Sequence, residues 1–200
     1  MHPETLARPL ILGSTSRYRA ELLQRLRLPF EVFAPLVDES PKPGEMSDLL
    51  ARRLALAKAR AVSTQHPQAV VIGSDQVCDL DGQLMGKPGK HAAAVEQLRR
   101  LSGRTAVFHT AVAVVCADSS FEQVDLATVR VRFRNLTASD IERYLQLDEP
   151  YDCAGSAKCE TLGIALLESI ESDDPTALVG LPLIRTAQLL RDAGIDPLRP

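Results

Sequence analysis

The chain has 200 residues and a formal net charge of −3; apolar side chains make up 45% of it and aromatic ones 4%. This length predicts a single domain, residues 1–200, with a mainly aliphatic core. The charge gives no basic field for nucleic acid, and no apolar run reaches the length of a membrane span. The N-terminus has no basic segment followed by an apolar one, so we expect no signal peptide, and the cysteine spacing predicts reduced thiols in a cytoplasmic protein.

The first predicted elements are a strand, a small polar loop and a helix. Apolar residues 10–12 predict the strand, and an apolar stripe predicts the helix over residues 17–26. Ser16 is a natural N-cap. Backbone N–H groups at such a helix start favour an anion, and Arg17 and Arg19 add positive charge. The loop lacks the GK[ST] ending of a P-loop, and a capped helix with two solvated arginines is the alternative interpretation.

Acidic and basic side chains follow in the next segments. Residues 30–33 alternate and predict a second strand, and the loop after it carries the acids Asp38 and Glu39. Ser47 is expected to cap a helix that runs to about residue 63. The cations of this helix, Lys58 among them, predict a solvated face.

The central stretch, residues 70–76, reads Val-Val-Ile-Gly-Ser-Asp-Gln. Three branched apolar residues predict a buried strand, and Gly73 and Ser74 are expected to end it. Asp75 would then lie at the carboxyl end of a strand, where open α/β sheets place their functional crevice. A carboxylate there can hold a metal or take a proton from water. The alternative is that Asp75 caps a turn.

The second half of the chain predicts a tight turn at residues 81–82 and then Lys87 between a glycine and a proline. We expect helices over residues 91–101 and 183–191. A further helix is expected to begin at Thr137, which forms a capping box with Asp140. Strands are predicted over 107–116, 124–133 and 164–167. A loop of small residues, 152–160, would let a ligand approach the backbone closely.

Cysteine and histidine spacing limits the metal chemistry of the chain. The cysteines form no CxxC pair and predict reduced thiols that act as small packing side chains. The histidines show no zinc-type spacing. If a metal binds, oxygen ligands must hold it, which favours magnesium or manganese.

Several of these segments together resemble the Maf family of nucleoside triphosphate pyrophosphatases, in order from about residue 10 to about residue 190. Residues 14–19 resemble the family's S-x-S-P-x-R start, with Arg17 in place of its proline. The other matching segments are Val-Asp-Glu at 37–39, Leu-Ala-Lys-Ala at 56–59, Gly-Ser-Asp-Gln at 73–76, Gly-Lys-Pro at 86–88, Cys-Ala-Gly-Ser at 153–156 and Val-Gly-Leu-Pro at 179–182. The resemblance implies an α/β fold with a long, curved mixed sheet flanked by helices and two lobes around a central cleft, similar to inosine triphosphatase.

The resemblance also implies roles for particular residues. Asp75 would be the catalytic base, and Glu39 with Asp75 would hold a divalent metal, Mg2+ or Mn2+. The phosphates of a small-molecule nucleotide would be bound by Ser14, Ser16, Arg19, Lys58 and Lys87. A homodimer is suggested by the family alone.

Within the family, the chain is similar to the subgroup that hydrolyses 7-methyl-GTP to 7-methyl-GMP and pyrophosphate and so removes a modified nucleotide. The residues that would select the base are Tyr18, Gln76 and Glu160. The subgroup often has tryptophan where this chain has Tyr18. Two alternatives stay open: the same chemistry on dTTP, UTP or another non-canonical nucleotide, and a non-catalytic nucleotide sensor that regulates cell division.

Overall fold

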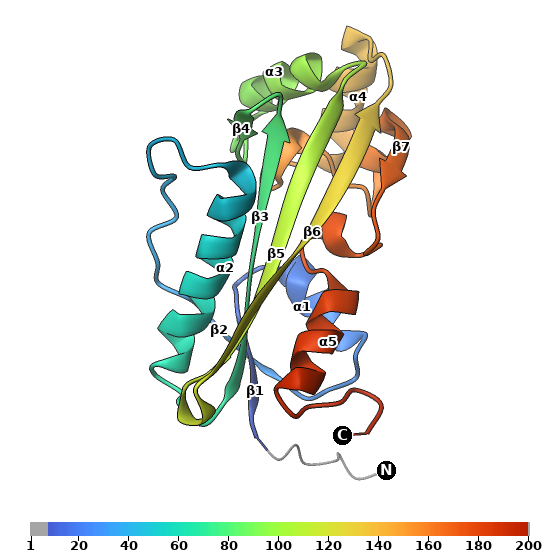
Figure 1. Cartoon of the computed structure of the whole chain (residues 1–200). Helices are drawn as coiled ribbons and strands as arrows, with labels where there is room; N and C mark the ends of the chain where they lie inside the picture. Colours follow the sequence, from blue (N-terminus) through green and yellow to red (C-terminus); the bar gives the residue numbers. More distant parts are fainter. Residues whose placement is uncertain (1–7, 200) are drawn as a thin grey trace. The chain divides into compact units, whose positions relative to one another are not determined.

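The computed structural model describes residues 8–199, which form a mixed α/β fold around a seven-stranded sheet (Figure 1). The strands are β1 (Leu10–Gly13), β2 (Glu31–Phe33), β3 (Val70–Leu80), β4 (Gln83–Met85), β5 (Thr105–Cys116), β6 (Phe121–Phe133) and β7 (Leu167–Glu171). The α-helices are α1 (Arg17–Gln24), α2 (Ser47–Ser63), α3 (His91–Leu101), α4 (Ala138–Asp148) and α5 (Leu183–Asp192).

The sheet has the order β2-β1-β3-β5-β6-β7, with β4 paired to β3 off this path. It is mixed, because β1 runs parallel to β2 and β3, whereas β4 is antiparallel to β3 and β7 is antiparallel to β6. These observations confirm the predicted α/β class with a mixed sheet. None of the described helices is long and apolar enough to cross a membrane.

The chain divides into two compact units. Among the described residues, the first comprises 8–75, 110–127 and 174–199, and the second comprises 76–109 and 128–173. The boundary in β3 falls between Asp75 and Gln76. The single domain over residues 1–200 and the cleft both stay predictions.

In the first unit, helices pack on both faces of the sheet. The side chains of Leu10, Leu12, Val70 and Ile72 belong to the same buried cluster as leucines of α1 and α5. Successive side chains of a strand point to opposite faces, so the intervening residues of β1 and β3 face α2. The parallel strands are therefore buried on both sides, which explains their continuous apolar runs.

Gly73 was predicted to end its strand. This prediction is wrong, because β3 continues to Leu80. The role of Gly73 is to let α2 approach the sheet. A Cβ atom at Gly73 would lie 2.2 Å from the Ala55 carbonyl oxygen and 2.6 Å from the Ala59 nitrogen. Only glycine permits this approach of helix and strand.

Two other predicted features are wrong and several are confirmed. Helix α2 begins at Ser47 itself, with Met46 as the N-cap, so Ser47 is not the cap. Most of residues 164–167 lie in a 3-10 helix, Leu162–Leu166, and the strand begins only at Leu167, because this region turns before it pairs with β6. The N-cap at Ser16, the bounds of α3 and the capping box of Thr137 with Asp140 are confirmed.

Candidate active site

The loop between β1 and α1 is organised by short side chains. Ser14 is buried, and its Oγ accepts hydrogen bonds from the Ser16 N–H at 3.2 Å and from Arg19 Nη1 at 3.4 Å. Ser16 Oγ accepts from the Arg19 N–H at 3.4 Å and caps α1. The predicted phosphate-binding residues of this loop therefore lie together at a helix start, where backbone N–H groups and the helix dipole favour an anion.

Arg19 is oriented by a segment far away in the sequence. Its Nε donates to the Gly180 carbonyl oxygen at 2.9 Å, and the fully buried Ser74 hydroxyl donates to the same oxygen at 3.0 Å. Burial lowers the pKa of Arg19 from its usual value, against the opposing effect of the negative charges of Asp75 and Glu39. The guanidinium group is thus held through Nε by Gly180 and through Nη1 by Ser14, and it experiences the negative charges of Asp75 and Glu39.

Lys58 connects the two acids that were predicted to hold a metal. Its Nζ lies 2.6 Å from Asp75 Oδ1 and 2.8 Å from Glu39 Oε1. Lys58 is only 5% exposed and Asp75 only 7%, whereas Glu39 is exposed. The prediction that the cations of α2 form a solvated face is therefore wrong for Lys58. The three side chains form a charged cluster, which we call the Lys58 cluster.

Asp75 does not lie at the end of its own strand, contrary to the sequence analysis. It lies inside β3, two residues beyond Gly73, which pairs with Gly13 at the end of β1. The carboxyl end that matters is therefore that of the neighbouring strand β1. A strand that extends beyond the end of its neighbour cannot be recognised from its own residues, because strand pairing is a tertiary property.

Tyr18 already has a cation against its ring. The Arg17 guanidinium carbon lies 4.8 Å from the centre of the Tyr18 ring, and Arg17 Nη2 donates to the Tyr18 hydroxyl at 3.0 Å. The contact satisfies the geometry of a cation–π interaction. Arg17 stands where the family motif has proline, so this pairing is a consequence of that departure.

Three predicted site residues belong to the second unit. Gln76 is half-buried in β3 and, by strand alternation, shares a face with Ser74 rather than with Asp75. Lys87 is exposed after β4, and Glu160 is exposed with its Oε2 3.6 Å from the thiol sulfur of Cys159. The contribution of these three residues to one site with the Lys58 cluster stays a prediction.

The donor set suits a divalent cation that also binds substrate. Glu39 and Asp75 offer two carboxylates around one ammonium group. Magnesium is usually held by one or two carboxylates together with waters and substrate phosphates. Within residues 8–199, no group of three or more His, Cys, Asp or Glu side chains could hold a metal by itself. The residues therefore fit a cation that the substrate helps to bind.

One residue that holds this site in place, Asp174, could not be found from the sequence. Asp174 is fully buried and accepts from the backbone N–H groups of Ile184 at 2.9 Å and Arg185 at 3.2 Å, at the start of α5. It thereby anchors the segment that carries Gly180. No local signal in the sequence distinguishes a buried acid that caps a helix from an exposed acid in a turn.

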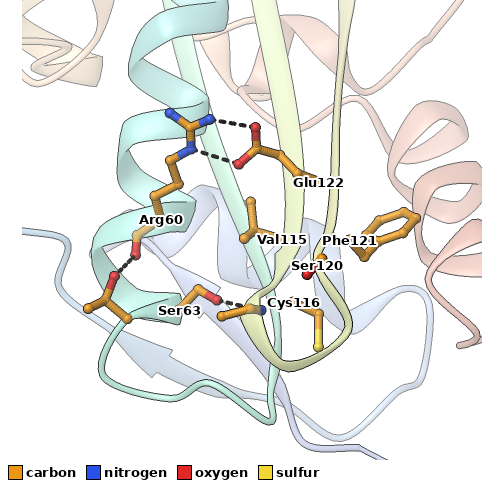
Figure 2. Close-up of a pocket in the computed structure, with 9 residues that line it drawn as sticks. Arg60, Ser63, Val115, Cys116, Ser120, Phe121 and Glu122 are labelled. Atoms are coloured by element: carbon orange, nitrogen blue, oxygen red, sulfur yellow. Dashed lines mark hydrogen bonds and ion pairs between the residues drawn. The ribbon is translucent and has the colours of Figure 1, made fainter.

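A separate pocket of about 290 Å³ lies at the C-terminal end of α2 and contains none of the predicted site residues. Figure 2 shows its edge, where the Arg60 guanidinium group donates two hydrogen bonds of 2.6 Å to the Glu122 carboxylate. Its lining residues include Ser63, Val115, Cys116 and Phe121.

The family model and the curated relatives that match this chain agree on one family. The family model described as Maf-like protein matches residues 9–193. A protein of Polaromonas sp. named 7-methyl-GTP pyrophosphatase is 69% identical over 94% of this chain and 86% of that protein. A protein of the same name from Albidiferax ferrireducens is 62% identical over 98% of both chains. Among solved structures, the Ham1 protein of Staphylococcus aureus is 17% identical, with a TM-score of 0.47 over 64% of this chain and 73% of that chain.

Proposed function

Because this chain belongs to the Maf family, we propose that it hydrolyses 7-methyl-GTP to 7-methyl-GMP and pyrophosphate, and so removes a modified nucleotide. The observation that carries the proposal is the Lys58 cluster. It occurs in a chain that is 62–69% identical to two proteins named 7-methyl-GTP pyrophosphatase. A small-molecule nucleotide is thus the proposed substrate. We further propose that the protein acts in the cytoplasm, binds no nucleic acid and forms a homodimer, as the family resemblance suggests.

In the proposed reaction, Asp75 accepts a proton from water while the water oxygen bonds to the α-phosphorus. The bond between the α-phosphorus and the bridging oxygen breaks, and pyrophosphate leaves. A positioned base of this kind contributes about 10²- to 10⁴-fold in rate. Lys58, 2.6 Å from Asp75, holds the carboxylate in place and adds positive charge for the phosphates.

The remaining cations have the task of binding phosphate. Arg19 binds the Gly180 oxygen through Nε and Ser14 Oγ through Nη1, and the remaining N–H groups of its guanidinium fork suit phosphate oxygens. Ser14 and Ser16 contribute the helix start, and Lys87 is assigned to the phosphates by the family resemblance. These groups are common to all nucleotides, so they do not select the base.

A divalent cation, Mg2+ or Mn2+, completes the proposal. Glu39 and Asp75 would hold it together with the phosphates of the substrate. When bound, the ion stabilises the negative charge that develops on pyrophosphate.

Selection of the base is assigned to Tyr18, Gln76 and Glu160. 7-Methylguanine carries a fixed positive charge on its imidazole ring, so its site should offer an aromatic face and an anion. Tyr18 supplies the first, worth about 0.5–2 kcal/mol in cation–π contacts, and Glu160 supplies the second through charge-assisted hydrogen bonds. Gln76 can donate or accept at the remaining polar atoms.

The experiment is pyrophosphate release by the purified protein, with Mg2+ or Mn2+, on 7-methyl-GTP, GTP, dTTP, UTP and inosine triphosphate. We expect kcat/KM for 7-methyl-GTP to exceed that for GTP at least about tenfold, which is about 1.4 kcal/mol. Equal values for these two nucleotides would contradict the base assignment. Preference for dTTP or UTP would favour the first alternative, and binding without hydrolysis of any nucleotide would favour a sensor.

A further inference from the structure

The side-chain amide of Gln97, on α3, joins two loops of the second unit. Its Nε2 donates to the Gly86 carbonyl oxygen at 2.9 Å, and its Oε1 accepts from Ser156 Oγ at 2.6 Å. A carbonyl oxygen can only accept a hydrogen bond, so the contact with Gly86 fixes which end of the amide faces which loop. One side chain therefore ties segment 86–89 to segment 153–156.

Segment 86–89 is held at both of its ends. Gln97 binds the first residue, and the N–H of Gly89 donates to the Tyr151 carbonyl oxygen at 3.0 Å. The proline after Lys87 further restricts the Lys87 backbone. Lys87 itself is exposed. The backbone of Lys87 is thus fixed, while its side chain reaches solvent.

The second loop that Gln97 contacts has an uncommon backbone. Gly155 has a φ of 72° and Ser156 a φ of 54°, in the left-handed region that non-glycine residues rarely adopt. A Cβ at Gly155 would lie 3.1 Å from Phe108 Cζ, so the loop packs closely on β5. Such a backbone persists only where its surroundings hold it. The hydrogen bond from Ser156 to Gln97 is one of those constraints.

We propose that Gln97 is a positioning residue, which fixes the backbone of Lys87 so that its ammonium group is ready for the phosphates of the substrate. The proposal rests on the proposed function, in which Lys87 binds phosphate. A cation on a fixed backbone loses less freedom when it binds, so more of its interaction energy is available for catalysis. Gln97 acts through Lys87 and does not itself touch the substrate.

Gln97→Glu is the sharpest variant for this proposal. It keeps the length of the side chain and an acceptor for Ser156, but it places an oxygen instead of an N–H against the Gly86 carbonyl. Gln188→Ala is the matched control, because Gln188 lies on an exposed face of α5 and binds Asp192 of its own helix at 2.8 Å. Thermal melting checks that each variant is folded.

The first measurement is a double-variant cycle on 7-methyl-GTP hydrolysis with Lys87→Ala. We expect Gln97→Glu to lower kcat/KM about tenfold in the wild-type background and less than about twofold in the Lys87→Ala background, because coupled residues are not additive. We expect Gln188→Ala to be unchanged. Equal factors in the two backgrounds would overturn the proposal, because Gln97 would then act independently of Lys87.

The second measurement does not depend on activity. Hydrogen exchange at the backbone amides of residues 86, 87, 89 and 90 reports local opening of this segment, since Pro88 has no N–H. We expect faster exchange there in Gln97→Glu than in the wild type and in Gln188→Ala. Unchanged exchange overturns the positioning role, whether or not the wild type hydrolyses a nucleotide. Absence of wild-type hydrolysis with faster exchange would instead overturn the proposed function and leave the positioning of Lys87 supported.

Discussion

Lys58 Nζ lies 2.6 Å from Asp75 Oδ1, and the two residues are 5% and 7% exposed. The ammonium group comes from the middle of α2 and the carboxylate from the middle of β3. A buried pair of this kind costs desolvation energy, which its Coulomb attraction offsets only with good geometry. Such pairs therefore contribute little net stability, and a catalytic role gives a reason for this one.

Asp75→Asn should abolish hydrolysis and leave the fold intact. The amide keeps an oxygen that Lys58 can bind, but it cannot take a proton from water. We expect a loss of at least about 10²-fold in kcat. Pyrophosphate release and a thermal melt measure the two effects separately. Turnover within about threefold of the wild type would remove Asp75 from the role of base.

Lys58→Met should destabilise the protein strongly, because it leaves the Asp75 carboxylate buried without its cation. We expect the free energy of unfolding to fall by about 3–5 kcal/mol, measured by urea denaturation. The double variant Lys58→Met with Asp75→Asn should recover part of this loss, because no lone charge is then buried. Lys87→Met, an exposed control, should change stability by less than about 0.5 kcal/mol. A small loss in Lys58→Met would show that the buried pair opens easily to water.

Gly180→Ala should disturb Arg19. Gly180 has a φ of 120°, and a Cβ there would lie 3.6 Å from Arg19 Nε. We expect kcat/KM to fall about tenfold, or about 1.4 kcal/mol, because alanine is strained at this φ and relief of the strain would move the carbonyl oxygen that Arg19 Nε binds. Gly194→Ala is the matched control, since Gly194 has a φ of 87° and nothing within 4 Å of its Cβ position. Equal activity losses in the two variants would point to backbone strain rather than to Arg19.

Tyr18→Ala and Glu160→Gln should each reduce the preference for 7-methyl-GTP over GTP, measured as the ratio of kcat/KM values. Hydrolysis itself should continue, because neither residue is assigned to the phosphates. Arg17→Ala is the informative companion, because it removes the cation that lies 4.8 Å from the Tyr18 ring centre. We expect it to keep or increase the ratio. Full preference in both Tyr18→Ala and Glu160→Gln would move base recognition to other residues.

Three of the four thiols should be unreactive in the folded protein. Burial raises the pKa of Cys78, Cys153 and Cys159 from 9.0 to about 12. At pH 8 the reactive thiolate should therefore be about a thousandfold rarer than in a thiol of pKa 9.0. We expect alkylation by iodoacetamide, followed by mass spectrometry, to be slow in the native protein and fast in urea.

The same shifts predict a dependence of stability on pH. Above about pH 9 the unfolded chain loses its thiol protons while the folded protein retains them, so stability should fall as the pH rises from about 9 towards 12. Urea denaturation across this range measures the effect. Replacing these cysteines by alanine should reduce the slope, and an unchanged slope would contradict the assignment to thiols.

Elements whose signals are local could be predicted from the amino-acid sequence alone. The bounds of α3 and, through the capping box, the start of α4 were predicted correctly, because such signals depend on residues within one or two helical turns. The order of the short motifs was enough to identify the family resemblance. It also singled out Asp75, Lys58 and Arg19 as chemically important.

The contacts that those residues make depend on tertiary packing. The role of Gly73 depends on how closely α2 approaches β3, and the position of Asp75 depends on where β1 ends. Hydrogen bonds pair Lys58 with Asp75, Arg19 with Gly180, and Gln97 with two loops. The paired residues are 11 to 161 positions apart in the sequence. Contacts over such separations depend on packing of the whole chain, and neither periodicity nor turn chemistry carries information about them.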